Sequence, residues 1–127
     1  QKGGYAVTGT AKEHYEAAIT ASMEYAGVSA AETATYLAQP AVAYDGTEYQ
    51  LGFQFWIAMF DNPFQGWSVW RKFDAPELNI AADSELPVPL RYTYPVNEQN
   101  LNETNYNAAS SAIGGDEQQT PLFWDVD

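Results

Sequence analysis

The sequence predicts a mainly α fold with one long, proline-rich extended segment. Three residue pairs have the Ser/Thr-x-x-Glu/Gln spacing of a capping box, in which each side chain binds a free amide of the first helical turn. They are Thr10 with Glu13, Ser29 with Glu32, and Thr47 with Gln50. Four prolines between residues 74 and 102 oppose regular helix there. We therefore expect helices within residues 1–73, an extended wrap over residues 74–101, and a terminal helix and tail over residues 102–127, with Asn102 as the N-cap of that helix.

The first two helices have clear start and stop signals. The helix that begins after Thr10 places one set of side chains at intervals of three and four residues, and Gly27 then ends it. This set comprises Tyr15, Ala18, Ile19, Ser22, Met23 and Ala26. A second, short helix follows Ser29 and ends before Pro40, because the residue before a proline disfavours helical conformation.

The most unusual segment is LGFQFWIAMFDNPFQGWSVWRKF, residues 51–73, which holds eight aromatic side chains. Asn62 followed by Pro63 is a typical helix start, because asparagine caps free amides and proline suits the first helical position. Two helices are therefore expected to meet at Asn62. The first of them carries two apolar rows, Tyr49, Phe53, Trp56 and Phe60 in one, and Leu51, Phe55 and Met59 in the other.

A strand is the alternative at the start of this segment, because Tyr49, Leu51, Phe53 and Phe55 alternate. The apolar pattern is too long for one strand and changes to helical spacing after Trp56, so we expect a helix. A helix that is apolar on two sides needs neighbours on both. We therefore expect an exposed apolar patch, larger than monomers usually have, which polypeptide outside these 127 residues covers.

Composition excludes several classes of function. The length allows at most one domain, and 46% apolar residues suffice for a modest core. The formal charge of -12, with five lysines and arginines, argues against binding to nucleic acid or to an anionic membrane surface. The absence of cysteine excludes disulfides and leaves the compartment open. The longest strongly apolar stretch, Leu51 to Phe60, is about half the roughly 20 residues of a membrane-spanning helix.

Three blocks of short motifs follow one another in a fixed order. The first is QFWIAMF (residues 54–60), Asn62, FQGW (64–67) and WRK (70–72). The second consists of Pro89, Arg91, Tyr94, Pro95, Glu98 and Asn102, and the third of NYNAA (105–109), GGD (114–116) and FWD (123–125). Together with SMEY (22–25) and YLAQP (36–40), they resemble the C-terminal part of SusD/RagB-type nutrient-binding lipoproteins, in the subfamily described as starch-binding and associated with the outer membrane.

The resemblance runs from about residue 15 to the last motif, with few departures. Phe55 stands where the family usually has lysine, Gly66 replaces alanine, Lys72 replaces arginine, and Phe123 replaces tryptophan. These differences affect local packing. The resemblance implies that residues 1–127 are the C-terminal segment of a SusD-like α domain whose tetratricopeptide-like N-terminal scaffold is absent.

The function that the resemblance implies is binding without catalysis. Such proteins are surface-exposed lipoproteins of the outer membrane, anchored through an N-terminal cysteine missing here, and they deliver oligosaccharides or peptides to a SusC-like TonB-dependent transporter. The implied partners are therefore the N-terminal portion of the same protein, that transporter and the ligand; no cofactor or metal is implied. The alternatives are a glycan-degrading enzyme or its accessory domain, and a purely structural interaction module.

Aromatic and histidine side chains offer candidate binding residues. Tryptophan faces stack on sugars, but Trp56, Trp67 and Trp70 are expected to be structural, because Trp56 shares the predicted core face with Phe60. Trp124 is open between docking and exposure. The resemblance places glycan contacts mostly outside this segment, so the ligand-binding residues stay unknown. His14 has no second ligand at metal spacing and is expected on a polar helix face.

Charged residues within the motifs are the other candidates. Asp61, Glu98 and Asp125 are the acidic residues in motif-rich surroundings, yet nothing in their spacing indicates a catalytic pair. Arg71 and Arg91 both fall inside the motifs of a chain with few cations. Arginine forms two-pronged bonds to carboxylates and carbonyls, so we expect buried ion pairing in which either could fix the extended wrap to the helices.

Overall fold

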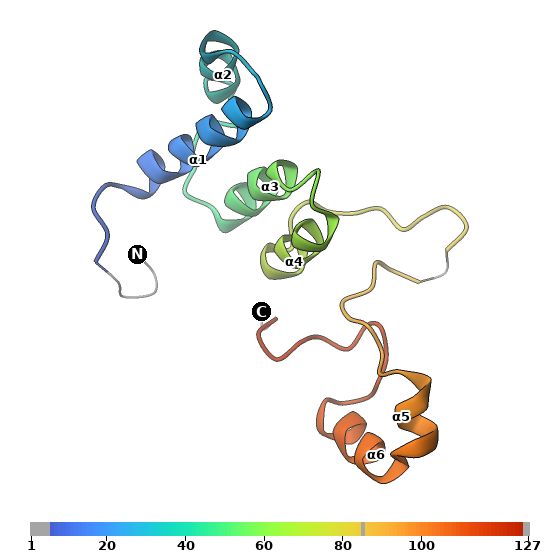
Figure 1. Ribbon diagram of the computed structural model, residues 1–127. Coiled ribbons are helices and arrows are strands. Elements are labelled where there is room, and N and C mark those ends of the chain that lie inside the picture. Colours follow the sequence, from blue (N-terminus) through green and yellow to red (C-terminus); the bar gives the residue numbers. More distant parts are fainter. Residues whose placement is uncertain (1–5, 85, 126–127) are drawn as a thin grey trace. The chain divides into compact units, whose positions relative to one another are not determined.

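Every regular element in the described part of the chain is an α-helix. The computed structural model describes residues 6–84 and 86–125. Its helices are α1 (Ala11–Tyr25), α2 (Ala30–Leu37), α3 (Glu48–Ala58), α4 (Pro63–Phe73), α5 (Val96–Leu101) and α6 (Glu103–Ala112) (Figure 1). They belong to two units, Gln1–Glu77 with α1 to α4 and Leu78–Asp127 with α5 and α6. The mainly α prediction is confirmed, as is helix rather than strand at residues 49–55.

Helices α1 and α2 begin with the capping boxes that the sequence predicts. The Glu13 amide donates to Thr10 Oγ1 at 3.2 Å, and the Thr10 amide donates to Glu13 Oε2 at 2.6 Å. Ser29 and Glu32 repeat the same reciprocal pair at α2. Helix α1 ends as expected at Gly27, whose φ of 80° suits glycine and whose amide donates to the Glu24 carbonyl.

The third predicted capping box, Thr47 with Gln50, is only half formed. Thr47 Oγ1 accepts from the Gln50 amide at 3.1 Å, but the Gln50 side chain does not return to Thr47. Its Oε1 accepts from the Asp45 amide at 2.8 Å, and its Nε2 donates to the Ala43 carbonyl at 2.7 Å. Gln50 is buried beneath the loop before α3, where backbone groups without water need partners. The Asp45 carboxylate accepts from the Thr47 amide instead.

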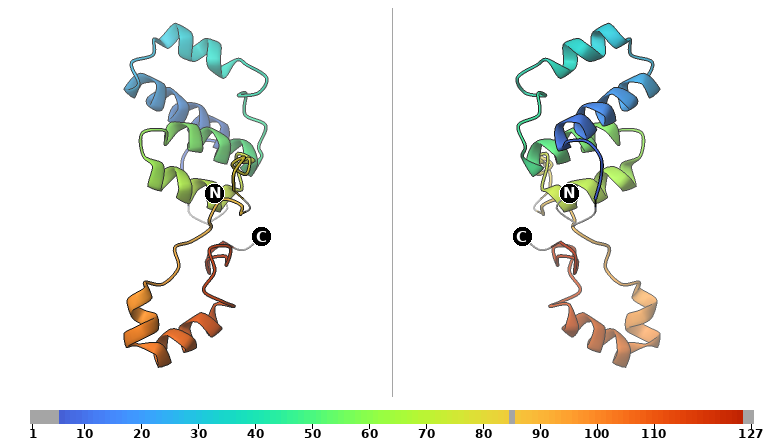
Figure 2. Two further views of the ribbon diagram at one scale, coloured as in Figure 1. Left: turned by 90° about the vertical axis from the view of Figure 1, so that its right-hand side faces the viewer. Right: turned by 90° about the vertical axis from the view of Figure 1, so that its left-hand side faces the viewer.

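Helices α3 and α4 run side by side and meet at the turn predicted at Asn62 (Figure 2). Asn62 Oδ1 accepts from the Gln65 amide at 3.4 Å, and Pro63 takes the first helical position. Gly52 of α3 faces the Phe73 side chain so closely that no Cβ atom would fit between them. The lack of a side chain at residue 52 therefore sets how near the two helices approach.

The two aromatic rows of α3 are less buried than the sequence predicts. The residues that α3 buries are Gln50, Gly52 and Gln54, while Trp56 is only half-buried. Phe60 is 89% exposed, so its expected place on a core face with Trp56 was wrong: α3 ends at Ala58, and Phe60 lies in the turn that follows. Exposed apolar surface on α3 is confirmed.

Within residues 6–84 and 86–125, no helix combines the length and apolar character needed to cross a bilayer.

The core of the first unit is small and lies between α1 and the segment after α2. Tyr15 and Ile19 of α1 pack with Val42, and four partly buried apolar side chains surround them: Met23, Tyr36, Leu37 and Tyr44. The Tyr15 hydroxyl donates to the Val42 carbonyl at 2.6 Å, and its ring lies 5.2 Å from that of Tyr44. A buried phenol needs such a partner, so this bond fixes the loop to α1.

The second unit contains most of the wrap and two helices, with two differences from the prediction. Residues 74–84 and 86–95 hold no helix or strand, but the predicted wrap up to residue 101 was wrong at its end, because α5 starts directly after Pro95. Asn102 precedes α6 but makes no side-chain cap. It also ends α5, and its side chain donates to Glu98 Oε2 at 2.9 Å. Residues 126–127 of the predicted tail lie outside the described residues.

Candidate functional site

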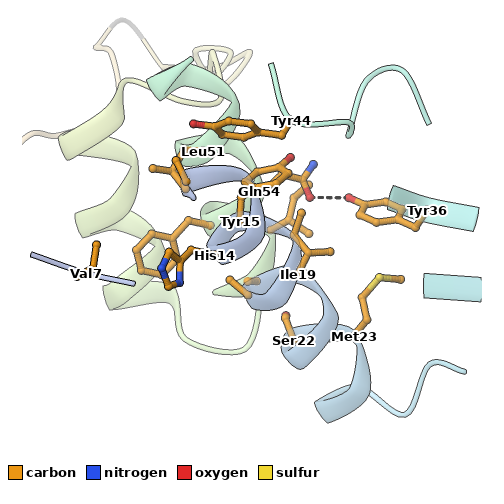
Figure 3. Close-up of a pocket in the computed structure, with 15 residues that line it drawn as sticks. Val7, His14, Tyr15, Ile19, Ser22, Met23, Tyr36, Tyr44, Leu51 and Gln54 are labelled. Carbon is orange, nitrogen blue, oxygen red and sulfur yellow. Dashed lines mark hydrogen bonds between the residues drawn. The ribbon is translucent and has the colours of Figure 1, made fainter. Parts of the chain in front are cut away.

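The candidate site in the first unit is a cavity of about 630 Å³. It lies between α1 and α3, and Figure 3 shows side chains of both helices directed into it. Helix α3 contributes Leu51, Gln54, Phe55, Ile57 and Ala58 to the lining. Helix α1 contributes side chains spaced three and four residues apart, from Ala11 to Met23. The lining is mostly apolar, which is typical of a binding cavity rather than of a site for acid–base chemistry.

Several of the polar groups that line this cavity have partners within the protein. The Tyr36 hydroxyl donates to Gln54 Oε1 at 2.8 Å (Figure 3), and the Tyr15 hydroxyl donates to the Val42 carbonyl. Burial raises the pKa of Tyr15 to about 12, so its phenol stays protonated at neutral pH. His14 Nε2 lies 2.8 Å from the Thr8 carbonyl. His14 thus lines a cavity, whereas the sequence placed it simply on a polar face.

The tryptophans of α3 and α4 are partly buried, and a structural role for them stays a prediction. Trp56, Trp67 and Trp70 are all half-buried. Trp70 Nε1 donates to the Pro76 carbonyl at 3.1 Å, which fixes the first residues of the wrap to α4. The fourth, Trp124, is also half-buried, so it is neither fully exposed nor part of a closed core.

Arg71 is buried, as expected. Its guanidinium lies 3.9 Å from the centroid of the Trp67 ring, and its Nε and Nη2 donate to the Trp67 carbonyl and to Ser68 Oγ at 3.4 and 3.2 Å. These contacts all lie along α4. They stabilise the helix and hold the Trp67 ring.

Arg91 forms the buried ion pair that the sequence predicts, in the second unit. Its Nη2 lies 3.4 Å from Asp116 Oδ1, and the two side chains are 10% and 2% exposed. The amide of Tyr94 donates to both oxygens of the same carboxylate at 3.0 and 3.1 Å. The wrap is therefore fixed to the segment that follows α6.

Sequence reasoning missed Asp116 as the partner of Arg91. The signal was present in Gly114-Gly115-Asp116, because two glycines with φ of 85° and 122° end α6 and leave the next side chain close to the wrap. The pKa of the Tyr106 phenol, on α6, is raised above its usual value. Burial is the main cause, and the negative charge of Asp116 is the next.

The candidate acidic residues do not form a described site. Asp61 is an exposed residue in the turn after α3, and Glu98 is exposed and bonded to Asn102. Asp125 is half-buried near the end of the described chain. Among residues 6–84 and 86–125, no three histidine, aspartate or glutamate side chains are grouped so that they could hold a metal ion.

Comparison with known proteins gives a family match. Residues 1–95 match the SusD-like family described as starch-binding associating with outer membrane. A comparison with curated proteins found no match. The matched region contains α1 to α4, the cavity between α1 and α3, and most of the wrap.

Solved structures match nearly the whole chain. One is described as a Bacteroidetes AC2a SusD-like protein, with 28% identity and a TM-score of 0.85 over 95% of this chain and 27% of that chain. A chitin-binding protein has 32% identity and a TM-score of 0.79 over 95% of this chain and 29% of its own. A chitin-binding SusD homolog from Flavobacterium johnsoniae has 27% identity and a TM-score of 0.79 over 98% and 33%. This chain spans between 27% and 33% of their lengths, and it belongs to the SusD-like family.

Proposed function

We propose that this chain is part of a carbohydrate-binding protein that captures oligosaccharides without cleaving them. The observation that carries the proposal is the likeness to a chitin-binding protein at 32% identity over 95% of this chain, together with the family match over residues 1–95. Fold alone does not fix function. Here sequence identity, fold and the description of the family all point to the same class of ligand.

The surroundings of Asp61 and Glu98, two of the three acidic candidates, favour binding over hydrolysis. Glycoside hydrolysis needs two carboxyl groups that flank the scissile bond, one of them held in an environment that keeps it protonated. Asp61 and Glu98 are exposed, and the Glu98 carboxylate is occupied by the Asn102 amide. Neither has the burial that a general acid of this kind requires.

The family description also supports a place at the outer membrane. We place the complete protein on the cell surface, held by a lipid on an N-terminal cysteine, with a SusC-like TonB-dependent transporter as its partner. In this arrangement the protein binds an oligosaccharide and passes it to the transporter. The N-terminal portion of the same protein would complete the fold around this segment.

Affinity capture tests this proposal. The complete polypeptide that the gene encodes is incubated with insoluble chitin, with insoluble starch and with cellulose as a control, and bound protein is measured after washing. Retention on chitin or starch that soluble oligosaccharides of the same sugar compete away is the expected result. Separately, the tagged protein should co-purify from outer membranes with a transporter encoded beside it. Binding to peptides alone, or to none of these polymers, would contradict the carbohydrate proposal.

A further inference from the structure

The end of the wrap pairs with the segment that follows α6, and the two run in opposite directions. The amides of Leu90 and Arg91 donate to the Gln118 carbonyl at 2.8 and 3.3 Å. Further from the helices, Gln119 Nε2 donates to the Pro87 carbonyl at 3.2 Å. Residues 87–94 and 116–120 therefore form a clasp, and α5 and α6 lie in the loop that it closes (Figure 1). We call residues 87–120 as a whole the arm.

Asp116 holds the clasp at the end nearest the two helices. Its carboxylate lies 3.4 Å from Arg91 Nη2 and accepts from the Tyr94 amide at 3.0 and 3.1 Å. Tyr94 directly precedes Pro95, the residue that caps α5, and Asp116 directly follows the two glycines after α6. One carboxylate therefore joins the chain that enters the helix pair to the chain that leaves it.

The arm is held by polar contacts rather than by an apolar core. The buried apolar residues of the described chain all belong to the first unit: Tyr15, Ile19, Val42, Val69 and Ala75. Neither α5 nor α6 buries a residue, whereas the side chains of Asp116 and Arg91 are only 2% and 10% exposed. A segment with few buried apolar contacts opens at low cost in free energy. Closure of the arm therefore depends on the bonds within the clasp.

Loss of the Asp116 carboxylate should release both helices together. Removal of one partner from a buried ion pair leaves the other charge without compensation, and the Tyr94 amide loses its acceptor as well. Helices α5 and α6 have 6 and 10 residues. Helices shorter than about 12 residues are barely stable on their own in water. Once the clasp separates, neither helix has enough support to persist.

We infer that Asp116 is a latch, which closes the arm into a cooperative unit that opens as one body while α1 to α4 stay folded. The division of the chain after Glu77 supports this independence. Segments that rearrange when a partner binds belong to the least stable units of a protein. The arm is therefore the part of this chain that is able to change conformation without disrupting the first unit. The inference does not depend on the carbohydrate proposal.

Native-state hydrogen exchange of the complete polypeptide, measured in low concentrations of urea, tests this inference. Amides of α5, α6 and the clasp should share one opening equilibrium constant, at least about tenfold larger than that of α1. Different constants for α5 and α6 would overturn the inference, because the arm would then not open as one body. A constant shared by the arm and α1 would also overturn it, because the two units would then unfold together.

Variants of the latch make the test specific. Asp116→Ala should raise the opening constant of α5 and of α6 by the same factor, about a hundredfold, and leave α1 to α4 unchanged. Asp116→Asn should have a smaller effect, since its side-chain carbonyl can still accept from the Tyr94 amide. Glu117→Ala, at an exposed position beside the latch, should leave exchange in both helices unchanged. Asn62→Ala, which removes the cap of α4, should speed exchange in α4 alone.

The outcomes separate a latch from an ordinary local contact. Faster exchange confined to residues 91–94, with α5 and α6 unchanged in Asp116→Ala, would overturn the inference. So would an equal increase in α1 to α4, or a variant in which the first unit is unfolded. The exchange of the unmodified protein decides the question even if Asp116→Ala is not obtained in folded form.

Discussion

Gly52 of α3 lies so close to Phe73 of α4 that the backbone of Gly52 packs directly against the Phe73 side chain. A Cβ atom on Gly52 would collide with the Cβ atom of Phe73 and lie 2.8 Å from its Cγ and 3.3 Å from the Cβ of Ala75. The atoms in the way are close to the α4 backbone, so a rotamer change cannot move them aside. This contact explains why α3 buries a glycine at this position.

Gly52→Ala should therefore destabilise the protein, by about 3 kcal/mol, because the added methyl forces α3 and α4 apart. Gly66→Ala is the matched control. A Cβ atom at Gly66 would meet Met59 only at 3.7 Å, and alanine favours helix by up to about 1 kcal/mol. Urea unfolding of the complete polypeptide measures both. Equal effects of the two substitutions would show that close packing at Gly52 is not what holds the helices together.

Asn62→Ala should cost about 1 kcal/mol, because it removes the acceptor that caps α4. The bond to the Gln65 amide is 3.4 Å long, so the loss is expected at or below that figure. Asn62→Asp should cost very little, since aspartate also caps helices. Urea unfolding again gives the comparison, and equal losses for both variants would mean that Asn62 does something other than capping.

The starts of the helices could be predicted from the sequence, because they depend on contacts between residues three apart. Thr10, Ser29 and Asn62 each accept the amide that the spacing predicts. The prediction was wrong where a side chain had a more distant partner. Gln50 bonds to the loop before α3 instead of completing its box, because that loop buries backbone groups that need partners.

The cavity and the ion pair depend on tertiary structure to different degrees. The stripe on α1 was visible in the sequence, but nothing in local spacing indicates that α1 and α3 lie far enough apart to leave a cavity between them. The burial of Arg91 was predicted, but its partner Asp116 is 25 residues away in the chain.

Helix α5 was missed because four prolines suggested an extended chain, although Pro95 occupies the position before a helix, where proline is tolerated.

Stability should fall at acidic pH through the two capping carboxylates. Hydrogen bonds from Thr10 and Ser29 lower the pKa of Glu13 and of Glu32 below the usual 4.5. Their contribution to stability is therefore full above the pKa of the unfolded chain and is lost as the pH falls through the lower pKa of the folded state. Glutamine also completes a capping box but does not titrate in this range.

The Glu13→Gln/Glu32→Gln double variant should therefore lose less stability than the parent between neutral pH and pH values below 4.5. Urea midpoints measured across this range give the comparison. Hydrogen bonds from Thr47 also lower the pKa of Asp45, which is present in both proteins. The stability of both should therefore still depend on pH to some extent. A double variant with an unchanged pH profile would show that the capping carboxylates do not contribute to acid sensitivity.

Asp116→Ala should destabilise the second unit by about 3 kcal/mol, because it leaves the Arg91 guanidinium and the Tyr94 amide without their shared acceptor. Asp116→Asn should cost less, since its carbonyl can still accept from Tyr94. The pKa of Tyr106 should also fall in Asp116→Ala, because the carboxylate that helps to raise it is gone. Urea unfolding and ultraviolet titration of tyrosine measure the two effects. Glu117→Ala, at an exposed neighbouring position, is the control for stability and should change it little. Because the Glu117 charge also raises the pKa of Tyr106, though less than Asp116 does, this variant should lower that pKa by less than Asp116→Ala.

The most direct test of the proposed function is calorimetric titration of the complete polypeptide with chito-oligosaccharides and malto-oligosaccharides, followed by chromatography of the recovered sugar. The expected result is saturable binding of at least one series, with every oligosaccharide recovered at its original length. Shortened products, or the absence of binding to both series, would contradict the conclusion that this SusD-like protein captures glycans without cleaving them.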